Sequence, residues 1–380
     1  KYDVIHLDIQ WCMEPAGGPE KVVPYISEKT IAELAEYYPV LAKARTQSLP
    51  EALSFLHAET GVKFVVIIDE WDVLIRDEAS NQRAQEEYIA FLRGLFKGTE
   101  PTKYLQLVYL TGILPIKKER TQSALNNFQE YSMLSAGPLA SDVGFTEEEV
   151  KNVCVQYGRS SESVRNWYDG YQLGDKHVYN PNAVVNLMLK GSFQSYWSGT
   201  ASYEAIVPLI NMDFDGLKEA IIEMLSGNHV SVDVASFQND TTSFVNKDDV
   251  LTYLIHLGYL AYDQTFGMAF VPNEEIRQEL IRATRRKKWN ELAKFQSESE
   301  KLLSATLDMN GEEVARQIET IHNEYASAIQ YNNENSLSSV LSIAYLSAME
   351  YYFKPIREMP MGRGFADYVF IPKPEYRRDY

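Results

Sequence analysis

The chain has 380 residues, which is enough for two or three domains with hydrophobic cores of their own. Hydrophobic residues make up 45% and charged residues 23%, the balance of a globular protein rather than a disordered one. The formal net charge of −17 excludes a uniformly basic surface that coats nucleic acid, although it permits a local basic cleft.

The cysteine content and the hydropathy of the sequence indicate in which cellular compartment the protein is expected. The two cysteines, Cys12 and Cys154, cannot form a disulfide framework, and there is no CxxC motif or Cys/His cluster for zinc. This usage fits a reducing compartment, so we expect a cytoplasmic protein. No apolar run approaches the ~20 residues of a membrane span, so we expect no membrane partner.

Residues 1–140 alternate between strand-like and helix-like segments. The segments "YDVIHLDIQ", "KFVVIID" and "YLQLVYLTGI" have the apolar, β-branched character of strands, and stretches with helical spacing separate them. This alternation predicts an α/β fold with a parallel sheet covered on both faces. We expect residues 65–68 to form its central strand, flanked by the strands around Ile5 and Val108.

The pattern changes near Phe145. In residues 141–310, the segment "DDVLTYLIHLGYLAYDQTFGMAFVPNEEIRQELI" has the order helix, strand pair, helix, which predicts a mainly helical domain with a small β-wing. The aromatic residues of "WYDGY" are expected to be core residues that close a turn at Gly170, with base stacking as the less favoured alternative. Residues 311–380 predict an amphipathic helix from about residue 334 and then a hairpin.

A cluster of carboxylates follows the central strand directly. Four apolar residues followed by Asp69 and Glu70 are the pattern of a Walker B strand, in which the first acid holds Mg²⁺ and the second orients the attacking water. Thr111 ends the next strand, where a polar residue can contact a γ-phosphate. We expect Asp69 and Thr111 at the same edge of the sheet, because ligands bind beyond the carboxyl ends of parallel strands. The alternative is a strand that ends in a solvated acidic turn.

The phosphate-binding part of such a site is not in this sequence. The motif GxxxxGK[ST] occurs nowhere in the 380 residues. We expect the loop to precede Lys1, and the chain as given to bind ATP poorly. Lys117 is a candidate phosphate ligand in "PIKKERTQ", although a lone basic residue after a strand is more often simply solvated.

Together these motifs resemble a bacterial family of AAA-ATPase-like proteins with a C-terminal PD-(D/E)XK nuclease-like domain. The likeness covers essentially the whole chain and is carried, in order, by "VVIIDEWDVLIRD", "YLTGILPIKK", "SALNNFQEYSML", "GFTEEEV", "WYDGY", "VYNP", "FQSYW", "LIHLGYLAY", "FVPNEEIR", "NNENSLSSVLSIAYLSA" and "GRGFADYVFIPK".

The resemblance implies three domains. Residues 1–140 would be a P-loop-type parallel sheet domain, residues 141–310 a mainly helical lid or winged-helix-like domain, and residues 311–380 a partial α+β restriction-endonuclease-like domain. ATP and Mg²⁺ would be the cofactors, and nucleotide and DNA or RNA the partners, while the oligomeric state stays open. The family's P-loop and its final Glu-x-Lys strand are both absent from this sequence.

For the C-terminal part, the resemblance implies Asp367 and Glu334 as metal ligands. Asp367 shares a strand face with Phe365 and Val369, where a carboxylate would need an arginine or a metal as its partner. We expect the two carboxylates to converge within roughly 4–8 Å, the span that a shared Mg²⁺ and its waters can bridge. Without the resemblance, both are more simply ordinary polar residues.

The sequence therefore predicts ATP hydrolysis by the first part of the chain and metal-dependent cleavage of DNA or RNA by the last. The alternative is a non-catalytic interaction or regulatory protein that keeps both folds and uses them to bind partners. An intact P-loop and Glu-x-Lys strand in the flanking residues would favour the enzyme.

Overall fold

The computed structural model describes residues 2–76, 81–116, 118–119, 122–123, 125–197, 202–212, 214–238, 244–284, 290–325, 341, 344–353, 355–362, 364–373 and 376. The chain divides into two compact units. Unit 1 comprises Lys1–Ser132 and Ala235–Val245, and unit 2 comprises Met133–Val234 and Asn246–Tyr380. The expected three-domain division of the chain stays a prediction.

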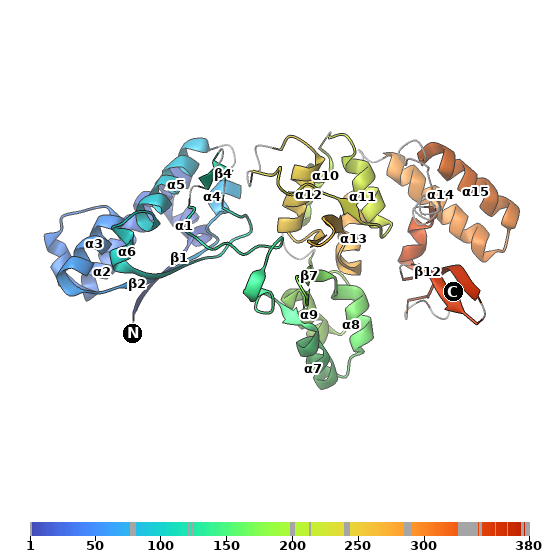
Figure 1. Cartoon of the computed structure of the whole chain (residues 1–380), viewed down its shortest axis with the longest axis horizontal. Coiled ribbons are helices and arrows are strands. Elements are labelled where there is room, and N and C mark those ends of the chain that lie inside the picture. The colour runs from blue at the N-terminus through green and yellow to red at the C-terminus, as the bar shows by residue number, and fades with distance from the viewer. Residues whose placement is uncertain are drawn as a thin grey trace. The chain divides into compact units, whose positions relative to one another are not determined.

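Unit 1 is built on a three-stranded sheet of order β1-β2-β3 (Figure 1). The strands are β1 (Asp3–Asp8), β2 (Phe64–Asp69) and β3 (Leu105–Leu110), and β2 pairs in parallel with both neighbours. The register sets Ile5 opposite Val66, and Val66 opposite Val108. The expected central strand and its two flanking strands are therefore confirmed.

Helices connect these strands and gather over the sheet in Figure 1. The described helices and short strands of unit 1 are α1 (Ile9–Ala16), η1 (Pro19–Lys21), α2 (Val22–Tyr37), η2 (Pro39–Lys43), α3 (Leu49–Thr60), α4 (Val73–Arg76), α5 (Gln82–Phe96), α6 (Pro101–Tyr104), β4 (Lys118–Glu119) and β5 (Gln122–Ser123). Their apolar faces bury one side of the sheet, including Phe64, Val66 and Ile68.

The other side of the sheet carries exposed residues, so the expectation that helices cover both faces was wrong for the described residues. Val4, Val65 and Leu107 lie in register on this side, followed by Tyr109. Val4 is 59%, Leu107 57% and Tyr109 48% exposed. Strand β3 carries apolar residues on both faces, so its sequence cannot show which face the described helices cover.

Unit 2 contains a cluster of short helices around aromatic residues. The elements are η3 (Gly137–Leu139), β6 (Phe145–Thr146), α7 (Glu147–Tyr157), α8 (Ser161–Tyr168), β7 (Tyr171–Leu173), β8 (Lys176–Tyr179) and α9 (Pro181–Lys190). Trp167, Tyr168 and Tyr171 are all buried, which confirms them as core residues. Gly170 has φ +129°, and a Cβ there would lie 1.8 Å from the carbonyl oxygen of Pro272, so only glycine fits this turn.

The predicted order helix, strand pair, helix is also confirmed in unit 2. It corresponds to α12 (Lys247–His256), β10 (Ala261–Asp263), β11 (Met268–Phe270) and α13 (Glu274–Thr284). The preceding elements are α10 (Ser202–Ile210), α11 (Leu217–Leu225) and β9 (Val230–Ser231), and β9 pairs with β11.

The last part of unit 2 begins with α14 (Asn290–Leu307) and α15 (Gly311–Tyr325). The amphipathic helix expected from residue 334 falls largely outside the described residues, and residues 346–350 form a 3-10 helix, η6 (Leu346–Glu350), rather than continuing an α-helix. The predicted hairpin is confirmed as β12 (Ile356–Met361) and β13 (Gly364–Val369). Within the described part of the chain, no helix has the length and apolarity to cross a membrane.

Candidate functional site

Asp69 and Thr111 meet at the carboxyl edge of the parallel sheet. Asp69 is the last residue of β2, and Thr111 directly follows β3. The Thr111 hydroxyl donates a hydrogen bond to Asp69 Oδ1, and the Thr111 amide donates to the Ile68 carbonyl at 2.9 Å. Thr111 in turn accepts from the amide of Trp71 at 2.9 Å. The expectation that Asp69 and Thr111 share one sheet edge is confirmed.

Asp69 and Thr111 offer oxygen ligands for a hard cation, but too few to coordinate it alone. Its Oδ1 also accepts from the Glu70 amide at 3.1 Å. The side chain is exposed, and Oδ2 makes no hydrogen bond to any described residue. Carboxylate and hydroxyl oxygens are the ligands that Mg²⁺ takes in proteins. The described residues contain no group of three metal-binding side chains, so a cation here would need water or phosphate oxygens as further ligands.

Glu70 is held in an unusual conformation next to this edge. Its φ of +50° lies in the left-handed region, which non-glycine residues rarely adopt. Its side chain accepts a hydrogen bond from Arg76 Nη2 at 3.1 Å, forming an ion pair. Backbone outliers of this kind cost about 1–3 kcal/mol and cluster at functional sites. The strained backbone and the ion pair together fix where the Glu70 carboxylate points.

Asp72 links the loops that follow β2 and β3. It is completely buried, and its Oδ2 accepts from the amides of Leu114 at 2.8 Å and Ile113 at 3.2 Å. Arg76 Nη1 lies 3.4 Å from the same oxygen. Burial raises the pKa of Asp72, against the opposing effects of these two amides and of Arg76. The carboxylate therefore holds the segment after Thr111 against the segment after Asp69.

Gly112 permits this close approach of the two loops. A Cβ at residue 112 would lie 2.5 Å from Asp72 Oδ1 and 2.7 Å from Trp71 Cδ1. Both neighbouring side chains are buried and cannot easily move away. The sequence analysis missed Asp72, Arg76 and Gly112. The sequence did contain one indication of a role for Asp72. It is an aspartate within the otherwise apolar run "WDVLI", where a carboxylate without a partner would be costly.

The remaining predicted site residues are Lys117, Glu334 and Asp367. Lys117 and Glu334 lie outside the described residues, so their roles stay predictions. Asp367 lies in β13 and is exposed, and Phe365 on the same face is 72% exposed. That face is therefore solvated rather than apolar and buried, which removes the expected need of Asp367 for a buried partner. Its approach to Glu334 stays a prediction.

Comparisons with known proteins bear on the same part of the chain. Residues 1–121 match the model of a family described as predicted AAA-ATPase, which covers β1 to β3 and the edge with Asp69 and Thr111. A match to this family suggests nucleotide binding. No solved structure shows significant similarity to the chain.

A curated relative comes from Azotobacter chroococcum mcd 1, where it is described as an uncharacterized protein in the vnfD 5' region. It is 29% identical over 163 residues, which are 42% of this chain and 31% of the relative. The chain thus matches about a third of the length of that protein.

Proposed function

We propose that unit 1 is the core of an ATP-hydrolysing enzyme whose reaction takes place at the carboxyl edge of its parallel sheet. The observation that carries this proposal is the convergence of Asp69, Glu70 and Thr111 at the ends of two adjacent strands. The family match over residues 1–121 supports nucleotide as the ligand. The reaction would also need a phosphate-binding loop, and the motif GxxxxGK[ST] is not among the 380 residues.

Each residue at the edge has a role that its position suits. Asp69, with an exposed carboxylate, would hold Mg²⁺ through oxygen ligation. Glu70 would orient and polarise the attacking water, and the Thr111 hydroxyl would contact the γ-phosphate. The metal, when bound, neutralises charge that develops on the phosphate oxygens. Lys117 would be a further phosphate ligand.

The ion pair with Arg76 bears on when the Glu70 carboxylate can meet a water molecule. While it accepts from Arg76, the Glu70 carboxylate is held by a cation and is not available to a water molecule. Arg76 keeps Asp72 as a second partner when Glu70 turns away. We propose that nucleotide binding releases Glu70 from this pair, so that its carboxylate becomes available to water.

The C-terminal part of unit 2 carries a second proposal. Asp367, with Glu334, would bind Mg²⁺ in a nuclease-like module that acts on DNA or RNA. Its support is the resemblance of the C-terminal motifs and the confirmed hairpin on which Asp367 is exposed. The competing function is a non-catalytic interaction or regulatory protein that uses the same surfaces to bind partners.

Calorimetric titration of ATP with and without Mg²⁺ tests the proposal. The present chain should bind ATP weakly or not at all, and a chain extended by its upstream segment should bind it with Mg²⁺. In the extended chain, Asp69→Asn should weaken the Mg²⁺-dependent binding by about tenfold or more, because one ionic ligand is lost. The matched control Asp142→Asn, at an exposed carboxylate in unit 2, should change nothing. An extended chain that binds no nucleotide would favour the non-catalytic alternative.

A further inference from the structure

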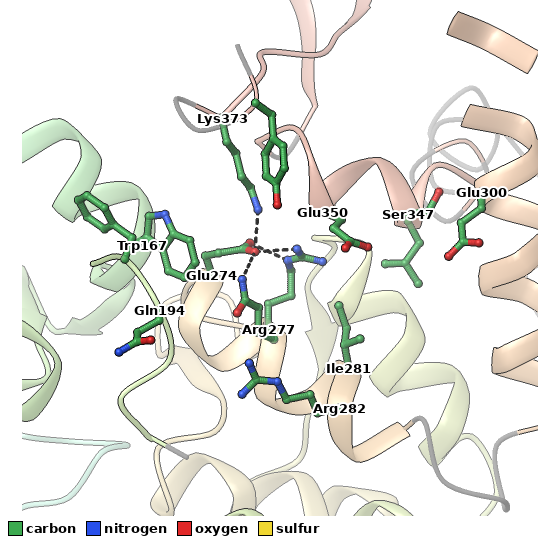
Figure 2. A pocket seen from close by; sticks show the side chains of 14 residues that line it. Trp167, Gln194, Glu274, Arg277, Ile281, Arg282, Glu300, Ser347, Glu350 and Lys373 are labelled. Carbon is green, nitrogen blue, oxygen red and sulfur yellow. Dashed lines mark hydrogen bonds and ion pairs between the residues drawn. The ribbon is translucent and has the colours of Figure 1, made fainter. Parts of the chain in front are cut away.

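Unit 2 contains a cavity of about 410 Å³ that no predicted site residue lines (Figure 2). Its walls come from α8, α13, α14, η6, the segment around Gln194, and the C-terminal residues Lys373 and Tyr376. The volume falls within the range of small-molecule sites in proteins. The cavity therefore has room for a ligand larger than a water molecule or a bare ion.

A buried group of charges forms one end of the cavity. Glu274 Oε2 accepts from Arg277 Nε at 2.8 Å, and Glu274 Oε1 accepts from Arg277 Nη2 at 2.9 Å and from Lys373 Nζ at 2.7 Å. Arg277 Nη2 and Lys373 Nζ also donate to the Met349 carbonyl, at 2.7 and 2.8 Å. One carboxylate is thus shared by two cations, and both cations are held rigidly by protein oxygens (Figure 2).

Arg277 keeps unused donor capacity in this buried setting. The residue is only 8% exposed, yet its Nη1 makes no hydrogen bond to any described residue. Figure 2 shows the guanidinium between Glu274 and Glu350, with its far nitrogen directed away from Glu274. Glu350 is exposed and forms no ion pair with Arg277 among the described residues. Nη1 is not among the fully buried side-chain atoms of the described residues that lack a partner, so it is open to the cavity, and an oxyanion is the acceptor that suits it best.

Aromatic side chains line another wall of the cavity, which favours a ligand with an organic part. Trp167, Phe193 and Tyr376 present rings to the cavity, and Lys373 Nζ lies 5.9 Å from the centroid of the Trp167 ring. The other charged residues lie at the rim or are already paired. Glu300 is exposed, and Arg282 Nη1 forms an ion pair with the buried Glu279 at 2.7 Å. Rings next to fixed cations favour an anion joined to a planar group.

We propose that this cavity binds a small organic oxyanion, a phosphate monoester or a carboxylate, with a planar ring as its body. The oxyanion accepts from Arg277 Nη1 next to Lys373, and the ring lies against Trp167. Arg277 is the specificity-determining residue, because its guanidinium can donate from Nη1 to an oxyanion while Nε and Nη2 stay on Glu274, which a single lysine ammonium cannot reproduce. Glu350 lies across the cavity from Glu274 and weakens binding by repulsion.

Calorimetric titration of the full chain tests this proposal, with phenyl phosphate and benzoate as probes and phenol as the neutral control. At least one of the two anions should bind saturably at one site, phenol should not, and the tighter anion identifies the preferred oxyanion. Arg277→Lys should weaken binding about tenfold or more. Glu350→Gln, at an exposed position that should tolerate the change, should tighten binding about two- to fivefold.

The control Glu312→Gln, at an exposed position of α15, should leave binding unchanged. The proposal is overturned if neither anion binds the wild-type chain at concentrations up to roughly 10 mM, which would mean that the charges only hold Lys373 onto α13. It is equally overturned if an anion binds but Glu350→Gln does not strengthen its binding, since the anion would then sit elsewhere. The test with Glu350→Gln remains valid even if the Arg277→Lys variant does not fold.

Discussion

Glu275 makes the stability of unit 2 depend on pH near neutrality. Its side chain is 1% exposed, and its Oε1 accepts from the amides of Tyr196 at 2.6 Å and Trp197 at 3.0 Å. Burial raises the pKa of Glu275 to about 7 from its ordinary 4.5, the two amides oppose this rise, and Glu279 adds to it. The folded pKa exceeds the unfolded one, so the stabilisation is complete below the unfolded value and is lost as pH rises through about 7.

The substitution Glu275→Gln should remove this pH dependence. Glutamine keeps an oxygen that can accept from both amides, but it cannot ionise. At about 1.36 kcal/mol per pKa unit, the wild-type chain should lose about 2.5 kcal/mol from this group between about pH 5 and about pH 8, and the variant should not. The variant should therefore gain stability relative to the wild-type chain as pH rises.

Urea denaturation at several pH values, followed by a signal from unit 2, measures this difference. The control Glu148→Gln changes an exposed carboxylate in α7 and should leave the pH dependence of the wild-type chain intact. If the free energies of unfolding of wild type and Glu275→Gln differ by the same amount at every pH, the carboxyl group of Glu275 is not shifted by burial and the reasoning is refuted.

Three further substitutions test packing and hydrogen bonding through the free energy of unfolding. Gly170→Ala should cost at least about 3 kcal/mol, because its Cβ would overlap the Pro272 carbonyl at positive φ, and near-wild-type stability would contradict this geometry. Asp72→Ala should cost about 3 kcal/mol, because Arg76 loses one of its two carboxylate partners and the amides of Ile113 and Leu114 lose their acceptor, and a loss below about 1 kcal/mol would show that the loops do not depend on it. Thr146→Ala should cost about 1 kcal/mol, because it removes half of the capping box of α7.

The strand order and the edge with Asp69 and Thr111 could be predicted from the sequence. Continuous apolar runs of strand length, separated by helical spacing, leave few arrangements other than a parallel sheet, and the carboxyl ends of its strands then meet at one edge. The turn at Gly170 was also predictable, since aromatic residues on both sides of an Asp-Gly pair indicate a tight, buried turn.

Contacts that depend on burial could not be predicted. The sequence alone does not distinguish a solvated aspartate from one that accepts buried amides, so Asp72 looked the same as its acidic neighbours. The open side of the sheet was missed because Leu107 and Tyr109 have the composition of buried residues. Lys373 and Glu274 pair across 99 positions of sequence, and no local pattern indicates such a contact.

The rate of ATP hydrolysis by Glu70→Gln tests the central claim most directly. The measurement compares this variant with its parent, both in the chain extended by the upstream segment, at saturating ATP and Mg²⁺. We predict that Glu70→Gln binds ATP as the parent does but loses most of its turnover, about 10²-fold or more, because water activation is removed while Asp69 is retained. A Glu70→Gln enzyme that is as active as its parent would contradict the role of Glu70 and the assignment of this edge as the reaction site.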